Sequence, residues 1–210
     1  MGGVLKPWAV STVAVAMLFL AGCSQSSSPS GEAPAAAAPA GPPKLVTGNT
    51  AFGPMYKAAR SWAPDLVILG IEAKDIPGFQ NDAGKAAMWQ ATFASPSLHK
   101  YRVDSYAIAT VLPDIHKGAS AGLGLPWPGA TRDAMPIDPS AFPVDSDAAY
   151  TAASADAADW LKKNPDKKPS SVGLVNAYKF HTPVWYVVWG DKKSGYIAYV
   201  DAMSGKVLKK

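Results

Sequence analysis

Apolar residues in the C-terminal third of the chain follow first a helical and then an alternating period. Between residues 146 and 163 they recur every three or four positions, which predicts an amphipathic helix capped by Ser146 or Asp145. The apolar face of that helix would carry Tyr150, Ala153, Ala157 and Trp160 or Leu161. Apolar runs between turn residues then predict strands at Val172–Phe180, Pro183–Trp189, Gly195–Asp201 and Val207–Leu208. This part of the chain is therefore expected to form one helix followed by about three antiparallel strands.

The same order of features occurs earlier in the chain. Residues 54–107 and 147–205 each contain an alanine-rich segment ending in tryptophan, a Pro-Asp stop, an apolar run, two aromatic residues four positions apart and a Val-Asp pair. The paired aromatics are Trp89 and Phe93 in the first copy and Trp185 and Trp189 in the second. Five features in one order indicate an internal repeat. The predicted fold class is α+β, with two units that each pack a helix on a small antiparallel sheet of about three strands.

Alternation along the strands assigns side chains to two faces. In the second copy Trp185 and Trp189 point to one side, expected to be the core under the helix that bears Trp160. Val184, Tyr186 and Val188 point to the other side, which is more apolar than a solvated face requires. We expect this outer face to be buried by the segment around Trp127, by the other repeat or by a partner. Tyr186 and Val188 are therefore the candidate partner surface.

The N-terminus has the pattern of a secretory signal. Lys6 precedes an apolar run, Trp8–Leu20, that is too short to span a bilayer. The next residues complete the tetrapeptide Leu20-Ala21-Gly22-Cys23, which resembles the lipobox of bacterial lipoproteins. The resemblance implies a signal peptide over residues 1–22, cleavage between Gly22 and Cys23, and lipidation of Cys23 through its sulfur, with acylation of the new amine. An ordinary cleaved signal with an incidental cysteine is the alternative.

The residues after the signal predict a tether and a membrane location. Residues 24–43 are mostly serine, alanine, proline and glycine, with Glu32 as the single charge, which is typical of a disordered tether. The remaining segments are a first repeat over 44–112, a Pro/Gly-rich connector over 113–144 and a second repeat over 145–210. By the lipoprotein resemblance, Ser24 favours the outer membrane facing the periplasm if the host is Gram-negative.

The charge and the cysteine content give no indication of nucleic-acid binding or of a disulfide-stabilised fold. Without Lys6 the chain has 19 basic and 16 acidic side chains, a net charge of +3 that is too small to indicate a nucleic-acid partner. Cys23 is the only cysteine, so no intramolecular disulfide is possible.

The second copy resembles the PepSY domain. The residues that carry this resemblance are the stretch PVWYVVWGDKKSGYIAYVDAMSGKVL, above all Val200–Val207 with its Val-Asp-Ala-Met-Ser-Gly turn. The likeness covers residues 147–210, whereas the first copy lacks the turn glycine after Asp104. PepSY domains have no known catalytic residues and are thought to bind or inhibit. The resemblance implies a non-enzymatic binding or inhibitory module of the cell envelope, with an exported peptidase or another envelope protein as its partner.

One short motif leaves an enzymatic alternative. Gly118–Gly122 fits G-x-S-x-G, the nucleophile elbow of serine hydrolases, and Asp145 and His181 follow Ser120 in the right order. However, Pro113 separates the strand-like Ala107–Leu112 from the motif, and the prolines downstream prevent a helix from starting. A serine hydrolase using Ser120 is therefore the alternative, and a structural envelope lipoprotein without a specific ligand is a third possibility.

No cofactor, metal site or catalytic residue is expected from the motifs. His99, His116 and His181 lack the close spacing of zinc ligands. Asp145-Ser146-Asp147 begins like a calcium loop but lacks its glycine and glutamate, so helix capping explains it better.

Overall fold

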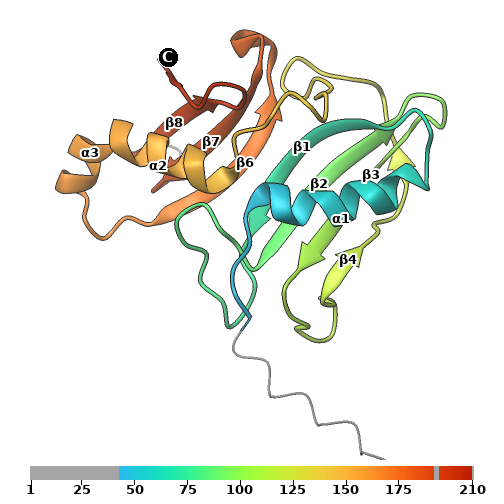
Figure 1. Cartoon of the computed structure of the whole chain (residues 1–210), viewed down its shortest axis with the longest axis horizontal. Coiled ribbons are helices and arrows are strands. Elements are labelled where there is room, and N and C mark those ends of the chain that lie inside the picture. The colour runs from blue at the N-terminus through green and yellow to red at the C-terminus, as the bar shows by residue number, and fades with distance from the viewer. Residues whose placement is uncertain (1–42, 192–193, 210) are drawn as a thin grey trace, which may run out of the picture. The chain divides into compact units, whose positions relative to one another are not determined.

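A computed structural model of the chain describes residues 43–191 and 194–209 (Figure 1). The signal segment, Gly22, Cys23 and the tether up to residue 42 lie outside the described residues. The described part falls within one compact unit. None of its helices combines the length and the hydrophobicity that crossing a bilayer requires.

The described residues form three α-helices, one short 3₁₀ helix and nine strands. The helices are α1 (Gly48–Arg60), α2 (Ser146–Asp156), α3 (Ala158–Lys163) and the 3₁₀ helix η1 (Tyr178–Phe180). The first five strands are β1 (Val67–Lys74), β2 (Met88–Ser95), β3 (Lys100–Ala107), β4 (Gly118–Ser120) and β5 (Leu125–Pro126). The others are β6 (Pro169–Asn176), β7 (Pro183–Trp189), β8 (Tyr196–Asp201) and β9 (Val207–Leu208). The fold class is α+β, as the sequence predicted.

All strands belong to one antiparallel sheet. Its order is β4-β3-β2-β1-β6-β7-β8-β9, and β5 also pairs with β3. Two small sheets were expected, and this expectation is wrong because β1 and β6 pair with each other, Ile71 opposite Leu174 and Glu72 opposite Gly173. The pairing provides hydrogen-bond partners for backbone N–H and C=O groups that would stay unpaired if β1 and β6 were the edge strands of two separate sheets.

The helices α1 and α2 cover one face of this sheet, and within the described residues no α-helix covers the other. α1 packs on β1, β2 and β3, and α2 packs on β6, β7 and β8 (Figure 1). Side chains from both helices enter one buried cluster with the inward-facing strand residues. We call the two sides the helix face and the helix-free face.

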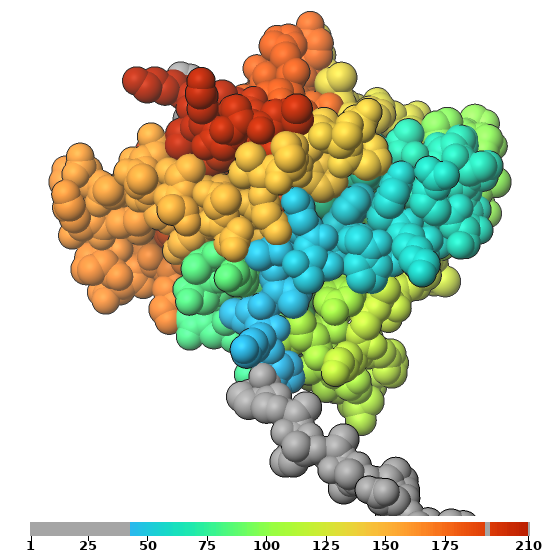
Figure 2. All heavy atoms as spheres, viewed as in Figure 1, coloured from blue at the N-terminus to red at the C-terminus, as the bar shows by residue number. Residues whose placement is uncertain are grey.

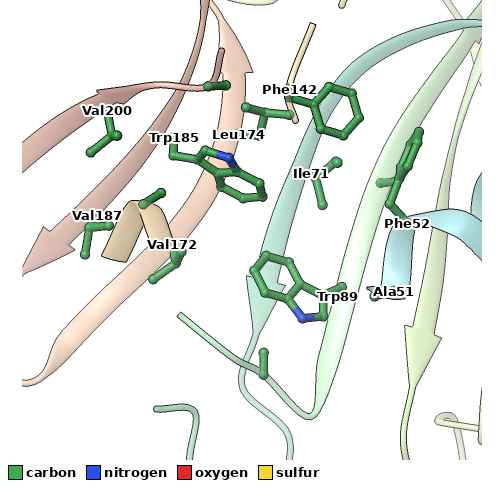
Figure 3. Close-up of a cluster of buried hydrophobic side chains, with 14 of the residues drawn as sticks. Ala51, Phe52, Ile71, Trp89, Phe142, Val172, Leu174, Trp185, Val187 and Val200 are labelled. Atoms are coloured by element: carbon green, nitrogen blue, oxygen red, sulfur yellow. The ribbon is translucent and has the colours of Figure 1, made fainter. Parts of the chain in front are cut away.

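Two tryptophans meet at the centre of the core (Figure 3). Trp89 and Trp185 are both fully buried, and their rings meet edge to face with centroids 6.2 Å apart. Each indole N–H donates to a carbonyl just before a helix, Trp89 to Val46 O at 2.9 Å and Trp185 to Val144 O at 2.8 Å. The predicted assignment of the tryptophans to the core is confirmed.

The N-termini of α1 and α2 are bonded to each other. Asp145 Oδ1 accepts from Ser146 N at 2.7 Å and from Asn49 N, on α1, at 2.9 Å. Ser146 Oγ accepts from Gly48 N at 2.8 Å and donates to Gly84 O at 2.6 Å. Asp145, one of the two predicted caps, is the N-cap of α2. On the surface, the segments of α1 and α2 lie in contact (Figure 2).

The local strand predictions are partly correct. β7 has the predicted bounds and β8 begins one residue late. The predicted strand Val172–Phe180 is wrong at both ends, because β6 already begins at Pro169 and ends at Asn176. After it, η1 turns the chain and His181 closes the turn with φ of 58°.

The connector between residues 113 and 144 differs from expectation. β3 ends at Ala107, so the predicted strand Ala107–Leu112 is absent from the described structure. The connector instead contains β4 and β5, which both pair with β3. Glycine, alanine and proline have low strand propensity, so these short strands form because β3 offers a free edge.

Candidate functional site

The helix-free face carries one row of side chains across the main path of the described sheet. Directly opposed residues in neighbouring strands project to the same face. The row contains Ser120, Ser105, Gln90, Glu72, Gly173, Tyr186, Tyr199 and Leu208. Its β4–β1 half is polar, and its β7–β9 half is aromatic and apolar. The two halves meet where β1 pairs with β6.

Tyr186 crosses that junction over a glycine. Gly173 is its cross-strand partner, and a Cβ at position 173 would lie 2.6 Å from Tyr186 Oη and 2.7 Å from Ile71 O. Only a residue without a side chain leaves room for the tyrosine ring to lie across β6. The hydroxyl consequently reaches Glu72, which belongs to β1.

A polar network surrounds the Tyr186 hydroxyl. The hydroxyl is hydrogen-bonded with Ser171 and Glu72, and Ser171 Oγ also donates to Glu72 Oε1 at 3.3 Å. Lys74 forms an ion pair with the same carboxylate. Burial, followed by the nearby negative charge of Glu72, raises the pKa of Tyr186 to about 12. Tyr186 therefore keeps its proton at neutral pH.

The face is hollowed on the side of Tyr186 where β1, β2 and β3 lie. One groove of about 390 Å³ extends from Tyr186 and Glu72 to Gln90, Thr92 and Val103. A second hollow of about 240 Å³ shares Leu69 and Thr92 with it and is closed by Tyr101 and Trp127. The groove thus runs from a polar junction to an apolar end.

On the other side of Tyr186 the row continues into an aromatic cluster. The Tyr199 ring lies 4.5 Å from that of Phe180, and Lys179 Nζ lies 4.5 Å from the Phe180 ring and 4.7 Å from the Tyr199 ring. Such a cation above two rings gives this end of the face positive charge.

The predicted partner surface is only partly as expected. Tyr186 and Val188 lie on the helix-free face and are half-buried, but Val184 is fully buried. The segment around Trp127, the other predicted repeat and a partner were expected to bury this face. The other predicted repeat supplies Glu72, which lies near the Tyr186 hydroxyl. Trp127 instead lines a hollow with Leu69 and Thr92. Sequence reasoning missed Glu72, Ser171 and Gly173. The glycine inside an apolar strand was the available signal, since such a glycine often marks a close approach.

The structure does not bring together the residues of the hydrolase alternative. Ser120 lies in β4, and His181 lies between η1 and β7, with β3, β2, β1 and β6 between the two strands. At about 4.8 Å per strand this is a separation of about 24 Å. Asp145 is engaged as the α2 cap. β5, rather than a helix, is the next element after Ser120.

A buried ion pair explains why glycine is needed at position 122, the second glycine of the G-x-S-x-G motif. Arg102 and Asp104 pair at 2.8 Å on the helix face with side chains 9% and 2% exposed, and Asp104 Oδ1 accepts from Gly122 N at 3.1 Å. Burial raises the pKa of Asp104. A Cβ at Gly122 would lie 2.1 Å from Val103 O, so the close approach requires glycine. The sequence pattern gave no indication of this pair.

The histidines stay apart in the structure. His99 lies in the turn between β2 and β3, His116 precedes β4, and His181 follows η1. Within residues 43–191 and 194–209, no group of three or more histidine, cysteine, aspartate or glutamate side chains could hold a metal ion.

Comparison with known proteins leaves the family open. No protein-family model matches the chain, and no curated protein matches it. A structural neighbour is a putative lipoprotein from Clostridium difficile 630, with 13% sequence identity, a TM-score of 0.46, and coverage of 76% of this chain and 90% of that chain. A likeness at this level carries no argument about function. The PepSY and lipobox resemblances rest on the residues quoted above.

Proposed function

We propose that this chain is a lipid-anchored protein of the cell envelope whose folded part binds another exported protein without catalysing a reaction. The anchor is assigned to Cys23 from the Leu-Ala-Gly-Cys sequence after an apolar segment. The partner is an exported peptidase or another envelope protein, and Ser24 favours the outer membrane, facing the periplasm, in a Gram-negative host. The two helix-and-strand segments correspond to duplicated PepSY-like units.

The observation that carries the binding proposal is the groove on the helix-free face. Its polar groups are already paired among themselves at Glu72, Lys74 and Ser171, so an occupant need not supply a missing charge. Its apolar end places Leu69 beside Tyr101 and Trp127, and tyrosine and tryptophan are residue types that contribute strongly to protein interfaces. A face with a paired polar junction and an aromatic end suits recognition of a polypeptide surface.

Photo-crosslinking in cells tests this proposal with the full chain. A benzophenone amino acid at Gln90 or Val188 would place the crosslinker on the helix-free face, and one at Lys57, exposed on α1, is the matched control. We expect one discrete adduct from both test positions, with the partner identified by mass spectrometry. Equal adducts from Lys57, or none from Gln90 and Val188, would reject this face as the binding surface.

The hydrolase alternative has a direct chemical test. A fluorophosphonate probe that labels the wild-type chain but not Ser120→Ala would establish a reactive serine. We expect no labelling of either protein, because β4 holds Ser120 far from His181.

A further inference from the structure

An exposed loop of the connector has no charged side chain. Between Lys117 and Arg132 the sequence is uncharged, and its central part is Ala-Gly-Leu-Gly-Leu-Pro-Trp-Pro-Gly-Ala, residues 121–130. Leu123 is 85% exposed and Leu125 is 47% exposed, while Leu98, on the adjoining β2–β3 turn, is 44% exposed. Large aliphatic side chains gathered in this way on a water-facing surface indicate a contact site.

The protein holds these leucines outward at several points. Gly122 N donates to buried Asp104, and Trp127 N donates to His99 O at 2.9 Å. Between these two contacts, Leu125 and Pro126 pair with Tyr101 and Lys100 of β3. The leucines are therefore presented by a fixed backbone.

The border of the loop has the residue types of a bilayer interface. Trp127 is half-buried at the base of the loop, and Lys100, which is exposed, lies opposite Pro126. Tryptophan and lysine favour the headgroup level, where a ring or an aliphatic stem lies against lipid and a polar end stays in water. In the sequence, Lys117 and Arg132 flank the loop and Asp133 follows it. Of the acidic side chains near the loop in space, Asp104, which accepts from Gly122 N, is buried in an ion pair with Arg102, and Asp65 accepts hydrogen bonds from Ser95 and Ser97 beside Leu98.

We infer that residues 121–130 dip into the interface of the bilayer that carries the lipid anchor. This inference rests on the proposed function, because the anchor at Cys23 keeps the folded part close to that bilayer. The loop lines a hollow together with Leu69, near the start of β1, whereas the chain enters the fold beside Ala86, which precedes β2 and lies toward the other end of β1. Eight strand residues span about 27 Å, and the 20 residues from Ser24 to Pro43 extend at most about 72 Å. The tether is therefore long enough for the loop to reach the lipid.

A single fluorescent label on the lipidated full chain tests the inference. Lipidation blocks Cys23, so Leu123→Cys supplies one free thiol for an environment-sensitive dye. In vesicles of phosphatidylethanolamine and phosphatidylglycerol, we expect a blue-shifted emission and strong quenching by lipids that carry a nitroxide on the acyl chain. The same dye at Leu112→Cys, which is 76% exposed outside this loop, should stay in water.

A second label excludes an effect of the dye itself. With the dye at Ala130→Cys and both leucines present, nitroxide quenching should be strong, and Leu123→Ser with Leu125→Ser should reduce it several-fold. A dye at position 123 that remains as accessible to aqueous iodide as one at position 112 would overturn the inference, and the loop would then face water or a protein. Mass spectrometry reports the acylation of Cys23 independently of the dye. If acylation is absent, the dye emission and quenching are measured in Cys23→Ser chains at saturating lipid. The experiments therefore distinguish the absence of lipidation at Cys23 from the absence of membrane insertion by residues 121–130.

Discussion

Trp185 and Tyr186 are adjacent residues with opposite environments. Trp185 is fully buried against Trp89 on the helix face, whereas Tyr186 is half-buried on the other face. Strand alternation was sufficient to predict this division, because successive side chains in a strand point to opposite sides. The partners of Tyr186 could not be predicted in this way. Gly173 and Glu72 belong to other strands, and the alternation of side chains along a strand does not specify how that strand is aligned with its neighbours.

Trp185→Ala should be far more damaging than Tyr186→Ala. The first removes a buried indole and its hydrogen bond to Val144 O, which should cost about 3–5 kcal/mol of unfolding free energy. The second removes a half-buried ring and one hydroxyl, which should cost about 1–2 kcal/mol. Urea midpoints give the order. If Tyr186→Ala has the lower midpoint, our assignment of the two faces is inverted.

The raised pKa of Tyr186 predicts a loss of stability at alkaline pH. The unfolded tyrosine releases its proton near pH 10, but the folded one does so near pH 12 because burial disfavours the anion. This contribution is complete below pH 10 and is lost as the pH rises from about 10 to 12. Tyr196, hydrogen-bonded to Asp156, has its pKa raised to about 12 and adds to the loss.

Tyr186→Phe should therefore weaken the alkaline loss. Urea midpoints at pH 8 and pH 11.5 should fall less in this variant than in the wild type. Tyr178→Phe, which removes a hydroxyl from an exposed ring, serves as the control and should keep the wild-type difference. Equal falls in all three proteins would show that Tyr186 is not the group responsible.

At the scale of elements, strands with an apolar pattern were predictable, including the short edge strand β9 at Val207–Leu208, but the short edge strands β4 and β5 were not. β7 is rich in valine and aromatic residues, and its predicted bounds are correct. β4 and β5 consist of Gly-Ala-Ser and Leu-Pro, which have no strand signal of their own, and they form because β3 has an open edge. The end of β6 was misjudged because the aromatic residues of η1 extend its apolar run into a turn.

Gly173→Ala should disturb the junction of β1 with β6. Its new Cβ would approach both the Tyr186 hydroxyl and the carbonyl of Ile71, and the carbonyl cannot rotate away as a side chain can. We expect a loss of about 1–3 kcal/mol in unfolding free energy, measured by urea denaturation. Gly124→Ala is the matched control, because its Cβ would come within ordinary contact of Lys100 alone, at 3.5 Å. A Gly173→Ala protein as stable as this control would argue against the tight crossing of Tyr186.

At the scale of the whole molecule, the order of helix and strands in each half of the chain was indicated by the sequence, but the joining of the two sets of strands was not. The pattern indicated a helix and about three strands in each segment. The structure has α1 over β1–β3, and in place of one helix in the second segment it has α2 and α3, of which α2 packs on β6–β8. Pairing of β1 with β6 depends on which edges come together in space, and nothing in the alternation of either strand names its partner.

Cys23→Ser tests the attachment of the whole molecule to the membrane. Loss of the sulfur should prevent lipidation, because no other side chain in the sequence carries a thiol. The precursor should remain uncleaved or be mislocalised, and fractionation with metabolic labelling by a fatty-acid analogue measures both effects. Ser24→Ala leaves the thiol intact and should still incorporate the label. Incorporation into Cys23→Ser would refute lipidation at this residue.

The pairing of β1 with β6 also has a consequence in time. Its partners lie about 100 residues apart in the chain, Glu72 with Gly173 and Gly70 with Val175. At a synthesis rate of about 5–20 residues per second, β1 exists for roughly 5–20 seconds before β6 has been made. During that interval one side of β1 has no partner, and such an edge is a template for pairing with another chain. Closing a sheet over so long a separation is slow in itself. The rate at which this junction closes should therefore decide how much newly made protein escapes aggregation.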